Sequence, residues 1–267
     1  MRRILLLVCL VSVSGCSLDS FLFSAKQEDY AFSTAIIPSA NTTMYTLTVA
    51  GKKVYGVHAF HVPASRDKLL YFHGNYRSLN HYYAWIEIYW EMGYDVFSID
   101  YEGFGRSEGS PSEDALIRDA EAAFQFVTSD LAWSRSDIVI YGYSLGSIPA
   151  VETSARQACR LLFLEAPIGN ADTVVNGASP LDIPSAFVIV KNFDNIERIK
   201  ASRNPLIVIQ GTADRTLPWE ENGKRVFDAA VVAKRCRWLE HAGHGDIPKD
   251  IGRENYKALL AELMAGW

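Results

Sequence analysis

Short, continuously apolar runs alternate with longer stretches of helical periodicity along most of this chain. The apolar runs occupy residues 68–73, 94–100, 138–143, 160–166, 205–210 and 237–240. Strands that are apolar on both faces are typical of parallel sheets with helices packed on both sides. The pattern therefore predicts an α/β fold with helices on both faces of a mostly parallel central sheet of about eight strands.

The beginning of the sheet has a different pattern. Residues 44–49 and 53–62 alternate apolar and polar side chains around Ala50-Gly51-Lys52, which predicts an antiparallel hairpin. Later in the chain, only residues 167–200 separate two strands of the core, and they must include a covering helix. Any lid over the sheet is therefore small. Five apolar side chains in it either form the rim of a groove or pack on the sheet: Val174, Val175, Ile183, Phe187 and Val188.

The strand at residues 138–143 runs directly into Gly142-Tyr143-Ser144-Leu145-Gly146 and then into a helix. Glycines two residues on either side of a serine allow a sharp strand-to-helix turn, which presents the serine hydroxyl at the end of the sheet. The free N–H groups at the start of the helix point at negative charge that develops beside that oxygen. We therefore take Ser144 as the candidate nucleophile and the N–H of Leu145 as one oxyanion-hole donor.

A serine nucleophile needs a base, and the base needs an acid that orients it. Asp214 and His244 follow the last two strands, so both are expected at the same edge of the sheet as Ser144. Either side chain has a simpler interpretation as a hydrogen-bonded loop residue. His241 is a competing base, but we favour His244 because it lies beyond the flexible Ala242-Gly243 pair and reaches further over the turn.

The second oxyanion donor is expected in the loop that follows residues 68–73. Gly74 lets the backbone approach closely there, and the next backbone N–H belongs to Asn75. The Asn75 side chain has an alternative role as a cap for the helix that follows.

These motifs together resemble the α/β-hydrolases, in particular the branch that includes the eukaryotic protein depalmitoylases and bacterial esterase-like proteins. The matching segments are His73-Gly74-Asn75, residues 100–107, Gly142 to Ser147, Gly211 to Asp214, and Gly243-His244. The resemblance covers the chain from about Thr42 onward and includes the order Ser, Asp, His. It implies Ser144 as nucleophile, His244 as base, Asp214 as orienting acid, and the Asn75 and Leu145 amides as oxyanion donors, with no cofactor and no metal. Residues 100–107 would brace the site, although Glu102 stands where many relatives carry arginine.

The N-terminal residues have the pattern of a targeting segment. Arg2 and Arg3 precede an apolar run over residues 4–13 that is too short to span a bilayer. The following Val13-Ser14-Gly15-Cys16 resembles the lipobox of bacterial lipoproteins, in which the cysteine takes a lipid and becomes the new N-terminus. We expect a signal peptide at 1–15, a tether lipidated at Cys16 over 16–40, and a hydrolase domain at 41–267. An ordinary signal peptide cleaved nearby is the alternative.

Composition narrows the partners and the compartment. The formal net charge is −5 and no Lys/Arg cluster interleaves with aromatic residues, which argues against nucleic-acid binding. In lipoproteins of bacteria with two membranes, an aspartate after the lipidated cysteine usually keeps the protein at the inner membrane. Ser17 follows Cys16 here, which favours anchoring at the outer membrane of the bacterial cell envelope. Cys159 and Cys236 remain in the mature chain; an oxidising compartment would permit a disulfide, but we favour free, buried thiols.

The leading hypothesis is a membrane-tethered serine hydrolase that cleaves acyl esters or thioesters, of lipids or acylated proteins, through an acyl-enzyme intermediate. A serine peptidase or amidase is the first alternative, because the same machinery cleaves amides. A non-catalytic envelope lipoprotein that uses a hydrolase fold as an interaction surface is the second.

Overall fold

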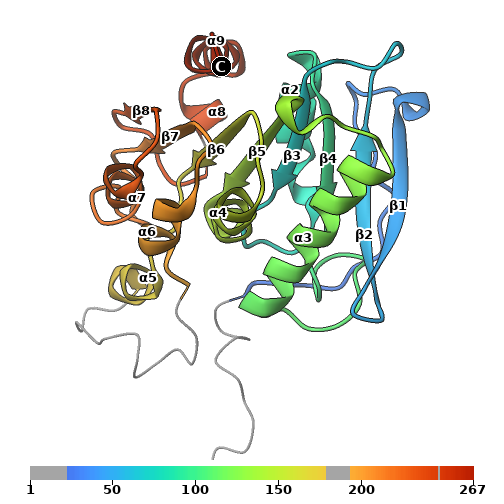
Figure 1. The fold of residues 1–267 in the computed structure, drawn as a ribbon, viewed down its shortest axis with the longest axis horizontal. Helices are drawn as coiled ribbons and strands as arrows, with labels where there is room; N and C mark the ends of the chain where they lie inside the picture. The colour runs from blue at the N-terminus through green and yellow to red at the C-terminus, as the bar shows by residue number, and fades with distance from the viewer. Residues whose placement is uncertain (1–22, 179–192, 246) are drawn as a thin grey trace, which may run out of the picture.

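The computed structural model describes residues 23–178, 193–245 and 247–267 (Figure 1). Its centre is an eight-stranded sheet with strand order β1-β2-β4-β3-β5-β6-β7-β8. β1 (Thr42–Val49) and β2 (Lys52–Ala59) form an antiparallel hairpin, and β2 also pairs antiparallel with β4. All the other neighbouring strands are parallel. The predicted parallel sheet with an antiparallel start is confirmed.

The remaining strands coincide with the apolar runs of the sequence. They are β3 (Lys68–Phe72), β4 (Asp95–Ile99), β5 (Ile138–Tyr143), β6 (Leu161–Glu165), β7 (Leu206–Gly211) and β8 (Lys234–Leu239). Only β8 begins clearly earlier than predicted. It lies at the edge of the sheet and is half-buried, so its first residues, Lys234 and Arg235, are polar and carry no apolar signal.

Helices cover both faces of the sheet. They are α2 (Tyr83–Glu91), α3 (Glu113–Ser129), α4 (Ser147–Arg156), α5 (Ala171–Ala178), α6 (Asn195–Arg198), α7 (Gly223–Ala229), α8 (Ile247–Asp250) and α9 (Arg253–Met264). Because side chains alternate along a strand, Leu70 and Phe72 of β3 join one buried cluster and Leu69 and Tyr71 join the other. The first cluster is covered by α3, α4 and α7, the second by α2, α8 and α9.

The buried face of α2 differs from the expectation. The sequence pattern suggested Tyr83, Ile86 and Trp90, but Tyr83 is 42% exposed, whereas Tyr82, Ile86 and Tyr89 are buried. Both sets have helical spacing. The chain enters α2 through a 3-10 turn, η2 (Leu79–Tyr82). A 3-10 turn has fewer residues per turn than an α-helix, so the row that contains Tyr82, Ile86 and Tyr89 faces the core.

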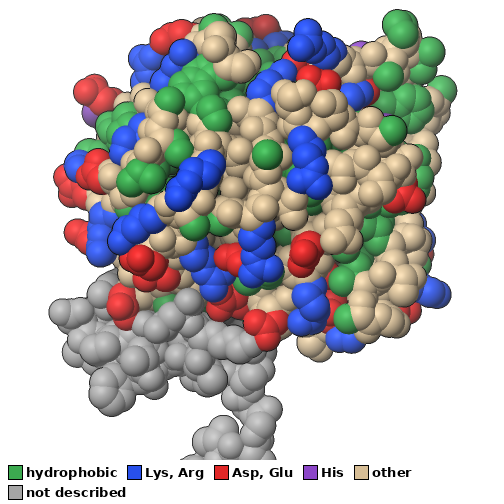
Figure 2. All heavy atoms as spheres, in the orientation of Figure 1, with side chains coloured by type: hydrophobic (Ala, Val, Ile, Leu, Met, Phe, Trp, Pro, Cys, Tyr) green, Lys and Arg blue, Asp and Glu red, His purple; other side chains and the backbone are tan. Residues whose placement is uncertain are grey.

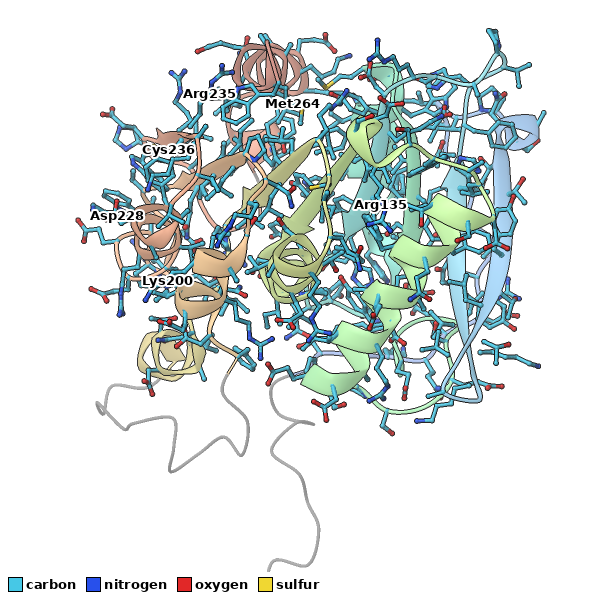
Figure 3. All side chains as sticks on the ribbon, in the orientation of Figure 1. Arg135, Lys200, Asp228, Arg235, Cys236 and Met264 are labelled. Atoms are coloured by element: carbon cyan, nitrogen blue, oxygen red, sulfur yellow. The ribbon has the colours of Figure 1, made fainter. Side chains whose placement is uncertain are left out.

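The two cysteines of the domain are free, as we favoured, but both are partly exposed rather than buried. Figure 3 shows Cys236 on β8 near the edge of the sheet. On the face seen in Figure 2, Lys and Arg side chains are interspersed with Asp and Glu. Among the described residues, Arg198 forms ion pairs with both Glu113 and Glu152.

The predicted signal peptide and Cys16 lie outside the described residues. Within the part of the chain that the structure describes, no helix is both long enough and apolar enough to cross a membrane.

Candidate active site

Ser144 lies in a tight turn between β5 and α4. The helix does not begin as a regular α-helix after Ser144; a 3-10 turn, η4 (Ser144–Gly146), comes first. Ser144 has a φ of 50°, a strained backbone conformation for a residue with a side chain. The flanking glycine is required by contact, because a Cβ on Gly146 would lie 2.1 Å from the carbonyl oxygen of Phe72. The turn from Gly142 to Gly146, here called the elbow, therefore packs directly against β3.

Three side chains from three different loops form a continuous chain of hydrogen bonds. Ser144 Oγ lies 2.9 Å from His244 Nε2, and His244 Nδ1 lies 2.8 Å from Asp214 Oδ2. The Asp214 side chain is fully buried, whereas the His244 ring is partly exposed. With Nδ1–H donating to Asp214, Nε2 is free to accept the proton of the Ser144 hydroxyl.

The Asp214 carboxylate is held by its own loop. Its Oδ1 accepts hydrogen bonds from the backbone amides of Thr216 and Leu217 at 2.9 and 2.8 Å, and its Oδ2 accepts one from Gln210 Nε2 at 2.9 Å. These donors satisfy the hydrogen-bonding capacity of a carboxylate that is buried from water. Gln210 is the last polar residue of β7, so the strand itself orients the carboxylate that faces His244.

His244 rather than His241 faces Ser144. His241 is exposed and has a φ of 66°, while His244 lines the same pocket as Ser144. The loop is held by the amide of Gly243, which donates to Asp250 Oδ2 at 2.9 Å. The structure thus places His244, and not His241, within hydrogen-bond distance of Ser144.

Ser144 opens into a pocket of about 350 Å³, a volume within the range of small-molecule sites. Asn75 and Leu145, the two residues whose amides we expected to bind an oxyanion, both line it. Gly74, the residue before Asn75, lets the backbone pass close to the ring of Tyr143, because a Cβ on Gly74 would lie 2.8 Å from that ring. The Oδ1 of the Asn75 side chain accepts a hydrogen bond from the amide of Ser24 at 2.8 Å.

The chain is similar in sequence to several known proteins. A family model described as serine aminopeptidase, S33, matches residues 63–190. Alpha/beta hydrolase domain-containing protein 17C of Mus musculus is 32% identical over 186 residues, which cover 69% of this chain and 56% of that protein. The protein aho-3 of Caenorhabditis elegans is 28% identical over 70% of this chain and 54% of its own length. The chain thus spans little more than half the length of these curated relatives.

Solved structures share the fold. An esterase of Pyrococcus furiosus superimposes with a TM-score of 0.72 at 17% identity, covering 92% of this chain and 97% of the esterase. Est1E from Butyrivibrio proteoclasticus, solved with ferulic acid bound, has a TM-score of 0.66 at 15% identity, with coverage of 83% and 99%. The chain has the α/β-hydrolase fold.

Residues 100–107 hold the loops around the pocket together. Asp100 is buried; its Oδ1 accepts from the amide of Leu79 at 2.6 Å, and its Oδ2 accepts from the Tyr30 hydroxyl at 2.5 Å. Burial raises the pKa of the Asp100 carboxyl, and these donors offset part of that rise. The hydroxyl of Tyr101 donates to the carbonyl oxygen of His73 at 2.9 Å, immediately before Gly74.

Glu102, the residue that departs from many relatives, lies outside the pocket lining. Its buried carboxylate pairs with Lys52 Nζ at 2.6 Å and with Arg118 Nη2 at 3.2 Å. Burial by itself would raise the pKa of Glu102, but the two cations outweigh burial and lower it. Glu102 therefore joins the β1–β2 hairpin to α3.

Several residues that line the pocket belong to no recognisable sequence motif. Phe23, Ser24 and Tyr76 line the pocket, and so do Phe193 and Leu217. In the sequence, only the apolar side chains of some of these loop residues could have suggested that they line a pocket.

Of the rim residues proposed from the sequence, Val174 lines the pocket. The side chains of Val175, Ile183, Phe187 and Val188 lie outside the described residues. Among the residues described, no group of three or more His, Cys, Asp or Glu side chains is arranged to hold a metal ion.

Proposed function

We propose that this α/β-hydrolase is a membrane-tethered serine hydrolase that cleaves acyl esters or thioesters through an acyl-enzyme intermediate. The observation that carries the proposal is the chain of hydrogen bonds that joins Ser144, His244 and Asp214. Ser144 lies at the end of this chain that lines the pocket, together with Asn75 and Leu145. The same groups in the same order perform acyl transfer on other α/β-hydrolases.

In the first half-reaction, Ser144 Oγ attacks the acyl carbon while His244 Nε2 takes the hydroxyl proton. The carbonyl π electrons move to the oxygen, and the amides of Leu145 and Asn75 donate to the resulting oxyanion. When the tetrahedral intermediate collapses, the bond to the leaving oxygen or sulfur breaks, and His244 gives its proton to that atom. The acyl group remains esterified to Ser144.

In the second half-reaction, a water molecule attacks the acyl-enzyme and gives a proton to His244 Nε2. Collapse releases the carboxylic acid and returns the proton to Ser144 Oγ. Asp214 keeps Nδ1 protonated throughout and stabilises the positive charge that forms on the imidazole.

The membrane part of the proposal rests on the sequence. Cys16 precedes Phe23 by seven residues, and seven extended residues span at most about 25 Å. Because Phe23 lines the pocket, a lipid on Cys16 would keep the pocket close to a bilayer surface. Full-length protein expressed in a bacterial host should fractionate with membranes, and Cys16→Ala should release it. Equal membrane retention of both would contradict lipid anchoring at Cys16.

Ser144→Ala tests the chemistry. Purified parent should hydrolyse p-nitrophenyl and thioester substrates and bind a fluorophosphonate probe, and Ser144→Ala should lower kcat by about 10³-fold or more and abolish labelling. Ser136→Ala, at an exposed serine on the turn before β5, is the matched control and should behave like the parent. Labelling of Ser144→Ala, or an unreactive parent, would contradict the proposal, and the latter would favour a non-catalytic role.

A serine peptidase or amidase is the second candidate, since the matching family model is described as a serine aminopeptidase. Aminoacyl amides and acyl esters with the same leaving chromophore separate the two. The proposal requires kcat/KM for the esters to exceed that for the amides well beyond the difference in their intrinsic reactivity.

A further inference from the structure

The segment Phe23–Tyr30, here called the N-terminal strap, lies between the loops that follow β3 and β4. It is the blue segment that crosses the lower part of Figure 1. The amide of Arg77 donates to the carbonyl oxygen of Ser24 at 2.9 Å, and the amide of Gly105 donates to that of Lys26, also at 2.9 Å. The strap is therefore bonded through its backbone to both loops, although more than fifty residues separate them from it in the sequence.

One side chain strengthens this attachment. The Glu28 carboxylate accepts from Arg77 Nη2 at 2.6 Å, and it also accepts from the Ser78 hydroxyl and contacts His81 Nε2 at 3.1 Å. Burial would raise the pKa of Glu28, but the hydrogen bonds from Ser78 and Arg77 prevail and lower it to about 2. The carboxylate is thus ionised and paired at neutral pH, which holds the strap in place.

Phe23 is the strap residue that reaches the pocket. Its ring is 6% exposed, packs edge-on against Phe104 with the centroids 6.4 Å apart, and lines the same cavity as Ser144 and Val174. The backbone next to Phe23 is bonded to two loops, which holds this part of the strap at the edge of the pocket. Phe23 therefore forms an apolar part of the wall of the pocket that contains Ser144.

We propose that Phe23 is a specificity-determining residue, whose ring limits the length and bulk of the acyl group that can lie beside Ser144. This inference rests on the proposed function. The pocket is small, about 350 Å³, so loss of a ring from its wall changes its shape substantially. In an apolar pocket, a difference of one methylene is worth about 10- to 200-fold in kcat/KM.

The wall is also coupled to the oxyanion site. Ser24, the next residue, donates its amide to Asn75 Oδ1 at 2.8 Å, and the amide of Asn75 is the proposed second oxyanion donor. An acyl group that pushes Phe23 aside therefore also displaces Asn75. Oversized substrates should consequently lose kcat in the parent as well as binding more weakly.

The test measures kcat and KM for p-nitrophenyl esters from acetate to laurate with the detergent-solubilised full chain. Phe23→Ala should raise the ratio of kcat/KM for long esters to that for acetate by at least about tenfold. Phe23→Leu, which keeps an apolar side chain and folds more readily, should give an intermediate ratio. Phe126→Ala is the control, because this half-buried ring lies on α3 against Tyr45 and Phe97, outside the pocket lining, and the variant should keep the parent ratio.

Two results distinguish the possible failures. If Ser144-dependent hydrolysis persists but both Phe23 variants lose activity equally for all chain lengths, Phe23 has only a structural role and this inference is overturned. If hydrolysis by the parent survives Ser144→Ala, the proposed function fails, and this inference fails with it.

Discussion

Nδ1 of His244 lies 2.8 Å from Oδ2 of Asp214, whose side chain is fully buried. The other carboxylate oxygen accepts from two backbone amides, so Asp214 has no freedom to rotate away from the imidazole. The pair therefore has one arrangement, in which Nδ1 carries the proton and Nε2 faces Ser144.

Asp214→Asn should lower kcat by about 10³- to 10⁴-fold with little change in KM, because an amide that donates to Nδ1 holds the imidazole in the wrong tautomer. Steady-state kinetics on a short acyl ester measure both constants. Asp250→Asn is the control, since it keeps an acceptor for the Gly243 amide in the same loop. A loss below about tenfold for Asp214→Asn would show that His244 does not depend on this carboxylate.

Glu28→Gln should make the protein less stable at neutral pH, and this deficit should disappear in acid. The folded-state pKa of Glu28 is about 2, below the value of 4.5 for an unperturbed carboxyl. Its stabilising contribution is therefore complete above about pH 5 and is lost as the pH falls from about 4.5 toward 2. Because the carboxylate is partly exposed, solvent screening limits this contribution to about 1 kcal/mol.

Urea unfolding of parent and Glu28→Gln at pH 7, 5 and 3.5 measures this difference. Glu197→Gln removes an exposed carboxylate that pairs with Lys200, and it should have little effect at any of these pH values. A Glu28→Gln deficit that stays constant down to pH 3.5 would exclude the paired carboxylate as its source.

The parent should become less stable as the pH rises from about 4 to 7, and Asp119→Asn should not show this loss. Burial raises the pKa of Asp119 from 3.8 to about 7, although its Oδ2 accepts from the Glu102 amide at 2.7 Å. The folded state therefore binds the proton more tightly than the unfolded state, and stability falls as the pH rises from about 4 to 7. Asparagine keeps an acceptor for the amide but has no charge to bury.

The measurement is the free energy of unfolding at pH 4 and pH 8. Between these values the stability of Asp119→Asn relative to the parent should improve by about 4 kcal/mol. Asp130→Asn, at the exposed C-terminal end of α3, serves as the comparison and should show no such trend. Parallel pH profiles for parent and Asp119→Asn would mean that Asp119 is ionised throughout this range.

Much of the fold was predictable because its signals are local. Six apolar runs predicted strands, and the two glycines around Ser144 predicted the elbow. Parallel strands bring their carboxyl ends to one edge, so the loops carrying Asp214 and His244 had to lie near Ser144 once the strands were assigned. The candidate site was therefore predictable as a set of loops, though not as a set of distances.

Signals failed where burial depends on distant segments. β8 was placed too late because its edge position tolerates polar residues, and the buried stripe of α2 was one of two that its spacing allowed. Glu102 had no interpretation in the sequence, since its partners Lys52 and Arg118 come from other elements. The role of Glu102 as a buried, paired carboxylate becomes clear only in the tertiary structure, which brings the two cations to it.

The amino-acid sequence by itself determined the strands, the elbow at Ser144 and the loops that carry Asp214 and His244, because each follows from residue types close together along the chain. Only the tertiary structure decided the wall of the pocket. Phe23 lines the pocket of Ser144 because the strap is hydrogen-bonded to loops at Arg77 and Gly105. Such contacts form between segments far apart in sequence and leave no periodic pattern in either one.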